Sequence, residues 1–155
     1  PKMKNLYLWG FLLVCALRPV AGMAQVPVPV KQHLEDKPQL FAQIPEKSAC
    51  RISDFTPYFR LKVHDPISLR LSDQLTVTGE VIAKVQQNAY VQSMNIRPVN
   101  YPGALLTLSI ISEPGKPVVF SGRMVSPGSG DVILLTRENN RYSLTKQWQK
   151  YFITE

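Results

Sequence analysis

The chain has 155 residues, of which 45% are hydrophobic and 19% are charged. This length fits a single domain, and the hydrophobic content is too high for a wholly disordered protein. The 18 basic and 11 acidic residues give a net charge of +7, and the glycines follow no G-X-Y repeat, which excludes collagen. Only two His and two Cys are present, so few side chains are available for a catalytic or metal-binding cluster.

Residues 1–24 are predicted to be a secretory signal peptide. Two lysines precede an apolar run at residues 6–17, which is too short to span about 30 Å of hydrocarbon. Gly22 and Ala24 are small residues at positions −3 and −1 of a cut before Gln25. We therefore expect an exported protein, periplasmic or secreted, without a transmembrane span.

Removal of the signal peptide changes the charge and the cysteine content. Three basic residues and no acidic ones leave with it, so 15 basic and 11 acidic residues remain, a net charge of +4. That excess is too small to indicate nucleic acid, which calls for a concentrated basic stripe. Cys15 also leaves, so Cys50 is the one remaining cysteine and an intramolecular disulfide is excluded.

Residues 25–57 are predicted to be an extended arm or linker. Five prolines fall in this range, and the segment VPVPV at 26–30 cannot form a helix because proline lacks an N–H and restricts the residue before it. Polyproline or edge-strand conformation is expected there.

From Tyr58 onward, apolar and polar residues alternate as in strands with one buried face. The alternating runs occupy residues 59–63, 67–71, 75–85, 90–97 and 118–125. Residues 104–111 are apolar and β-branched, residues 132–135 are apolar on both faces as in a central strand, and a last strand is expected at 141–144. Gly79 interrupts the third run, which predicts a bulge or a close backbone approach. Asn139–Asn140 fits a two-residue type I′ hairpin.

The connections between these runs are too short for parallel crossovers, which need a dozen or more residues. We therefore predict an all-β fold for residues 58–155, a small antiparallel β-sandwich or partly closed barrel of seven or eight strands.

Cys50 is the first candidate site residue. A lone exported thiol is either buried, paired with another molecule, or used as a ligand or nucleophile. Lys47 and Arg51 lie beside it and would lower the thiol pKa if the side chain were exposed. Cys50, Arg51 and Lys47 are therefore predicted as contacts to a partner.

The sequence has few features of a catalytic site. G-x-S-x-G and H-E-x-x-H are absent from the sequence, and no second cysteine is left for a zinc pair. His64–Asp65 reads as the end of a strand, and Asp131 as a turn residue. We expect no cofactor and no catalytic activity; an enzyme that uses Cys50 or His64 is an alternative.

Six basic residues in the later part of the chain alternate with apolar ones, as on a solvated sheet face. An anionic polysaccharide or a cell-envelope surface is the ligand that such a face would bind. These residues are Arg97, Arg123, Arg137, Arg141, Lys146 and Lys150.

Short segments over about half of the chain resemble β-rich propeptide or N-terminal domains of secreted bacterial peptidases. They are Gly79–Glu80–Val81, Ser93–Met94–Asn95–Ile96, Leu106–Thr107–Leu108–Ser109, Phe120–Ser121–Gly122–Arg123–Met124 and Tyr142–Ser143–Leu144. The resemblance implies an export chaperone or an inhibitor. We therefore expect an exported, non-catalytic domain that binds a protein partner. A structural subunit of a cell-envelope assembly, whose arm adds a strand to a neighbour, is an alternative.

Overall fold

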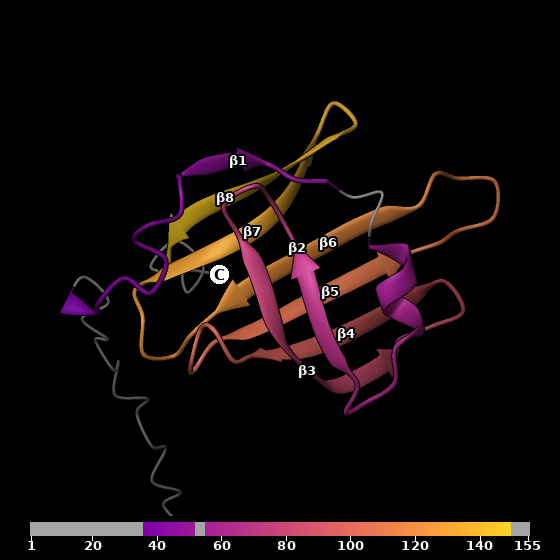
Figure 1. Ribbon diagram of the computed structural model, residues 1–155. Helices are drawn as coiled ribbons and strands as arrows, with labels where there is room; N and C mark the ends of the chain where they lie inside the picture. The colour runs from indigo at the N-terminus through magenta and orange to yellow at the C-terminus, as the bar shows by residue number, and fades with distance from the viewer. Residues whose placement is uncertain (1–35, 52–54, 150–155) are drawn as a thin grey trace, which may run out of the picture. The chain divides into compact units, whose positions relative to one another are not determined.

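The structure is a computed structural model that describes residues 36–51 and 55–149. These residues form an all-β domain, in which one antiparallel sheet curls into a half-barrel (Figure 1). The predicted signal peptide, residues 1–24, and the first part of the predicted arm lie outside the described residues.

Eight strands make up the sheet, in the order β1-β8-β7-β6-β5-β4-β3-β2. Their bounds are β1 (Lys47–Ala49), β2 (Pro66–Arg70), β3 (Thr76–Gln86), β4 (Val91–Pro98), β5 (Leu105–Ile111), β6 (Val119–Val125), β7 (Asp131–Glu138) and β8 (Arg141–Trp148). From β2 to β8 each strand pairs with its successor, and β1 pairs with β8. The predicted all-β, antiparallel fold is confirmed.

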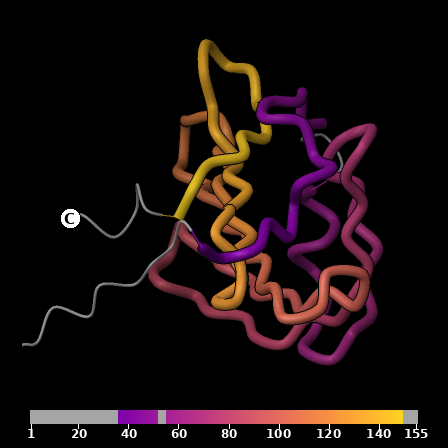
Figure 2. Tube along the Cα trace, turned by 90° about the vertical axis from the view of Figure 1, so that its left-hand side faces the viewer, coloured from indigo at the N-terminus to yellow at the C-terminus, as the bar shows by residue number. Residues whose placement is uncertain are grey.

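The sheet curls because β3 bends along its length. The pairing of β3 with β4 shifts register between Val81 and Ala83, and a bulge of this kind increases the local twist. Figures 1 and 2 show that β2 and the first part of β3 consequently lie in front of β5 and β6. Gly79 is not the bulge, but it marks a close approach: a Cβ there would lie 2.2 Å from the carbonyl oxygen of Arg97.

The core lies on the inner face of the curled sheet, where side chains of successive strands meet in register. Met94 pairs with Leu108, and Leu106 pairs with Met124. At Gly122, an added Cβ would lie 2.6 Å from Cδ2 of Leu108, so the glycine leaves room for that leucine. The alternation seen in the sequence predicts the buried face of β4 and β6, where Met94, Ile96, Phe120 and Met124 are buried.

The prediction of a strand at residues 59–63 is wrong. Thr56–Arg60 form the 3₁₀ helix η2, with Pro57 in its first turn. A proline there fixes φ without losing a hydrogen bond, because the first N–H groups of a helix have no partner within it. His64 then adopts a left-handed φ of 76°, which ends the extended run before β2.

The predicted boundary at residue 57 falls inside the folded domain. Phe41 and Ile44 are buried in the core, and β1 is part of the sheet, although all three lie in the range predicted as an arm. Phe55, also in that range, packs edge-on against Phe120 at a centroid distance of 5.9 Å.

Two side chains far along the chain hold this segment in place. The carboxylate of Asp131, itself buried, accepts hydrogen bonds from the N–H groups of Leu40 at 2.9 Å and Phe41 at 2.8 Å. Nζ of Lys146 donates to the carbonyl oxygen of Ile44 at 2.7 Å, with longer contacts to the carbonyls of Phe41 and Ala42. Residues 36–49 are therefore built into the domain.

Candidate functional site

The open sheet has two edge strands, β1 and β2, and exposed edges are where another chain can pair. In the ladder of β2 with β3, the main-chain groups of residues 67 and 69 face β3, so those of Pro66, Ser68 and Arg70 face outward. Pro66 has no N–H to donate, and the carbonyl of Ser68 accepts the hydroxyl of Tyr58 at 2.9 Å. The β2 edge is therefore partly blocked.

The β1 edge has no comparable block among the described residues. The N–H of Cys50 donates to the carbonyl of Tyr142 at 3.0 Å, and the N–H of Lys146 donates to the carbonyl of Glu46 at 2.8 Å. Even-numbered residues of β1 thus face β8, and the alternation of an antiparallel ladder turns the N–H and C=O groups of Lys47 and Ala49 outward. A second chain could pair with these groups.

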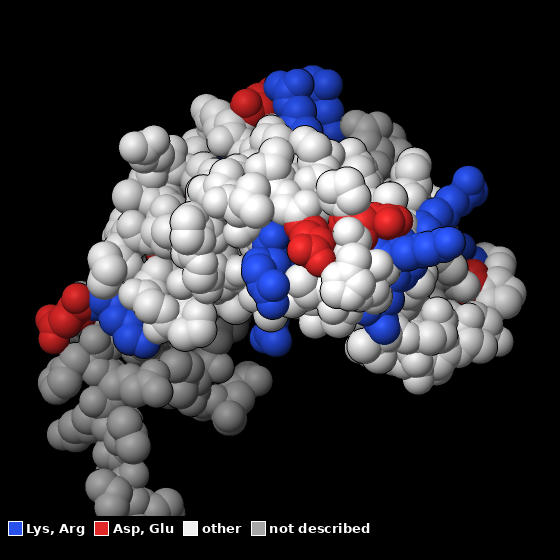
Figure 3. All heavy atoms as spheres, turned by 60° about the horizontal axis from the view of Figure 1, so that its bottom comes forward, with Lys and Arg blue, Asp and Glu red and all other residues white. Residues whose placement is uncertain are grey.

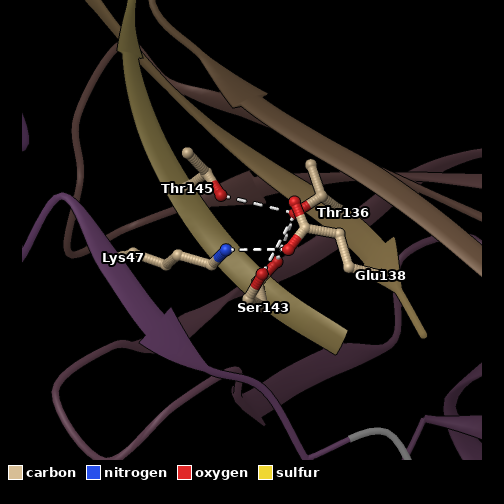
Figure 4. A network of polar contacts seen from close by, with 5 residues as sticks. All are labelled: Lys47, Thr136, Glu138, Ser143 and Thr145. Atoms are coloured by element: carbon tan, nitrogen blue, oxygen red, sulfur yellow. Dashed lines mark hydrogen bonds and ion pairs between the residues drawn. The ribbon is translucent and has the colours of Figure 1, made fainter. Parts of the chain in front are cut away.

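Polar contacts on the outer face join β7 to β8, and one exposed ion pair joins β1 to β7 (Figure 4). Nζ of Lys47 reaches past β8 to Oε2 of Glu138 on β7, at 2.9 Å. Beneath this pair, Oγ1 of Thr136 lies 3.1 Å from Oγ of Ser143 and 3.3 Å from Oγ1 of Thr145. The extended conformation of β1 itself comes from its ladder with β8, and an incoming strand can match it.

A depression of about 550 Å³ borders this edge. Ala49 contributes only a methyl group to its lining, and Ser143, which faces Ala49 across the ladder, is also small. Arg141 and Tyr142 complete the side nearest the hairpin of β7 and β8. The small side chains leave room beside β1 for a larger side chain from another molecule.

The three residues predicted as partner contacts lie together on this edge but point in different directions. Lys47 and Arg51 are exposed, whereas Cys50 packs against the core. Burial raises the pKa of the Cys50 thiol from 9.0 to about 12, the opposite of the lowering expected from its basic neighbours. Desolvation outweighs the positive field, so Cys50 remains a neutral thiol at physiological pH.

A second surface lies on the outer face of the sheet, away from the core. A groove of about 600 Å³ runs there, and it includes Ser93 and Ser109, whose hydroxyl oxygens are 2.7 Å apart. Arg123 lines the groove and is exposed; it takes part in no ion pair with any described residue. This is a hydroxyl-rich groove whose lining has one cation without an ion pair.

The sequence predicted that the six later basic residues lie on one solvated sheet face, but in the structure they do not. Arg137 lies over the ring of Tyr142 at 5.7 Å, and Lys146 binds main-chain carbonyls. Arg97, Arg123 and Arg141 are exposed, while Lys150 lies outside the described residues. On the face shown in Figure 3, acidic and basic side chains lie beside one another in small groups rather than in a single basic stripe.

Cys50 and His64, the residues of the alternative in which the protein is an enzyme, are bonded to different strands. The main chain of Cys50 is bonded to β8, whereas the main chain of His64 is bonded to Val81 of β3, and Nδ1 of His64 lies 2.7 Å from Oε1 of Glu80. No described hydrogen bond joins the two residues. Within residues 36–51 and 55–149, the structure has no group of three or more His, Cys, Asp or Glu placed to hold a metal ion.

No helix among the described residues is long and apolar enough to cross a membrane. No family model, no curated protein and no solved structure matches the chain. The edge strand β1 was not predicted from the sequence. Residues 47–49 are too few to show an alternating pattern, and their pairing with β8 depends on residues about a hundred positions away.

Proposed function

We propose that this chain is an exported, non-catalytic β-domain that binds a protein partner by accepting an extended segment of it along β1. The observation that carries the proposal is the difference between the two edges. Pro66 and Tyr58 block part of the β2 edge, while the main-chain groups of Lys47 and Ala49 on β1 face outward and have no partner among the described residues. Strand addition of this kind gives affinity through main-chain hydrogen bonds and specificity through alternate side chains.

Other parts of the proposal rest on the sequence. Export rests on the basic start, the apolar run and the small residues of 1–24. The absence of catalysis rests on the scarcity of His and Cys and the lack of a recognisable catalytic motif. An inhibitory or propeptide-like role is what the resemblance to peptidase propeptide domains implies for the bound partner.

Proline substitution at the two edges tests the proposal. Ala49→Pro removes an outward N–H from β1 and leaves the bonds of Ser48 and Cys50 to β8 in place, because proline is tolerated on an edge strand where the N–H faces solvent. Ser68→Pro makes the same change on β2 and is the matched control. Each mature protein is immobilised as bait for an envelope extract, after thermal unfolding confirms that it folds.

The wild type and the Ser68→Pro variant are expected to retain one defined protein, and the Ala49→Pro variant to bind it at least about tenfold more weakly, since a main-chain bond and the fit of the strand are lost. Equal retention by all three baits would contradict strand addition at β1. Retention of the chain itself would point to the alternative, a structural subunit that pairs with its own copies.

A further inference from the structure

We infer that the β1 edge selects an acidic strand, one that carries two carboxylates flanking a bulky residue. This rests on the proposed function, because it names the partner of the same edge. The edge and its depression carry Lys47, Arg51 and Arg141 against two acids, Glu46 and Glu138, a local excess of one positive charge among the described residues. Opposite charges directly across a ladder stabilise a strand pair, and like charges oppose it.

The spacing of the carboxylates follows from the alternation of the strand. Lys47 and Ala49 share the outer face of β1, and Arg51, which is exposed, continues the same alternation. A strand paired with β1 therefore places its own alternate side chains opposite these three. The pattern acidic–x–bulky–x–acidic puts a carboxylate near each cation, and it reads the same for a parallel or an antiparallel partner.

The central position of that pattern faces Ala49. The methyl group of Ala49 and the small side chain of Ser143 leave the depression of about 550 Å³ open beside it. A leucine-sized side chain opposite Ala49 would therefore cover the depression while the main-chain bonds form. The Lys47–Glu138 pair does not prevent this, because both side chains are more than half exposed and can adjust.

The same charge argument disfavours pairing of the β1 edge with a second copy of this chain. Antiparallel self-pairing that sets Ala49 opposite Ala49 also sets Lys47 opposite Arg51 on both sides. Short, cationic edge strands are a common means of preventing a protein from pairing with itself. The cations therefore exclude the copy and leave the edge available to a strand of opposite charge.

The experiment measures binding of two synthetic peptides to the mature protein, by titration followed through amide chemical shifts. One peptide has the sequence STETLTETS and the other STKTLTKTS. The acidic peptide is expected to bind more tightly, about tenfold, since two attractive pairs replace two repulsive ones. Arg51→Glu should weaken the acidic peptide about fivefold, and Arg97→Glu, an exposed reversal on β4, is the matched control that should leave it unchanged.

The outcomes separate this inference from the proposed function. Equal affinity for both peptides, lost in Ala49→Pro, would overturn the acidic preference and leave strand addition standing. Undiminished binding of the acidic peptide by Ala49→Pro would overturn strand addition at β1. If neither peptide shifts the amides of residues 47–51, the acidic pattern is refuted, and the bait experiment decides the proposed function by itself.

Discussion

The Asp131 carboxylate holds the N-terminal segment to the sheet through the N–H groups of Leu40 and Phe41. Asp131→Ala leaves the buried N–H of Phe41 and the partly buried N–H of Leu40 without an acceptor, so we expect a loss of about 2–4 kcal/mol in the free energy of unfolding. Asp73→Ala is the control, because its exposed pair with Arg70 should contribute about 0.5 kcal/mol or less. Urea denaturation measures both, and equal losses would show that Asp131 is not an anchor.

The neutral thiol of Cys50 makes stability depend on alkaline pH. Its pKa is raised from 9.0 to about 12 in the folded protein, so its contribution is complete below pH 9 and is lost as the pH rises toward 12. Between pH 8 and pH 10 the wild type should lose about 1 kcal/mol more than Cys50→Ala, a value already reduced for the partial exposure of the side chain. Identical pH profiles would contradict the burial of this thiol.

At the scale of elements, residues 36–51 behave as part of the domain. Limited trypsin digestion of the wild type should leave a fragment that still includes this segment, because Phe41 and Ile44 are buried and Lys146 binds its carbonyls. Lys146→Met should release the segment to early cleavage, whereas Lys116→Met, in an exposed turn, should not. Early loss of residues 36–51 from the wild type would contradict their place in the domain and would support the extended arm predicted from the sequence.

Strands β2 to β7 could be predicted from the sequence because each carries a local signal, which is alternation in β2, β3, β4 and β6 and an apolar run in β5 and β7. Strand β8 follows from the hairpin that joins it to β7. The Asn139–Asn140 hairpin could also be predicted from the sequence, and both residues have positive φ as a type I′ turn requires. The errors have a different physical origin. The run at 59–63 alternates, but Pro57 starts a 3₁₀ helix just before it and His64 turns the chain just after it. The segment before β1 is held by Asp131 and Lys146, whose bonds to the main chain of residues 40–44 no local pattern encodes.

At the scale of the whole molecule, the candidate site comes from sheet topology rather than from a motif. From the sequence, Lys47, Cys50 and Arg51 are predicted as partner contacts, with Cys50 as the main one, and all three lie at the β1 edge. The fold turns that thiol toward the core and leaves the cations and main-chain groups facing outward. Their role as partner contacts stays a prediction, and it now rests on the geometry of an unpaired edge.

Amide hydrogen exchange, resolved by residue, tests the central claim most directly. In the free protein, the N–H groups of Ser48 and Cys50 should exchange slowly because they bond to β8, and those of Lys47 and Ala49 should exchange near the rate of an unstructured chain. Addition of the acidic peptide should protect Lys47 and Ala49. Protection of these two amides already in the free protein, or no change when the peptide binds, would contradict strand addition at β1.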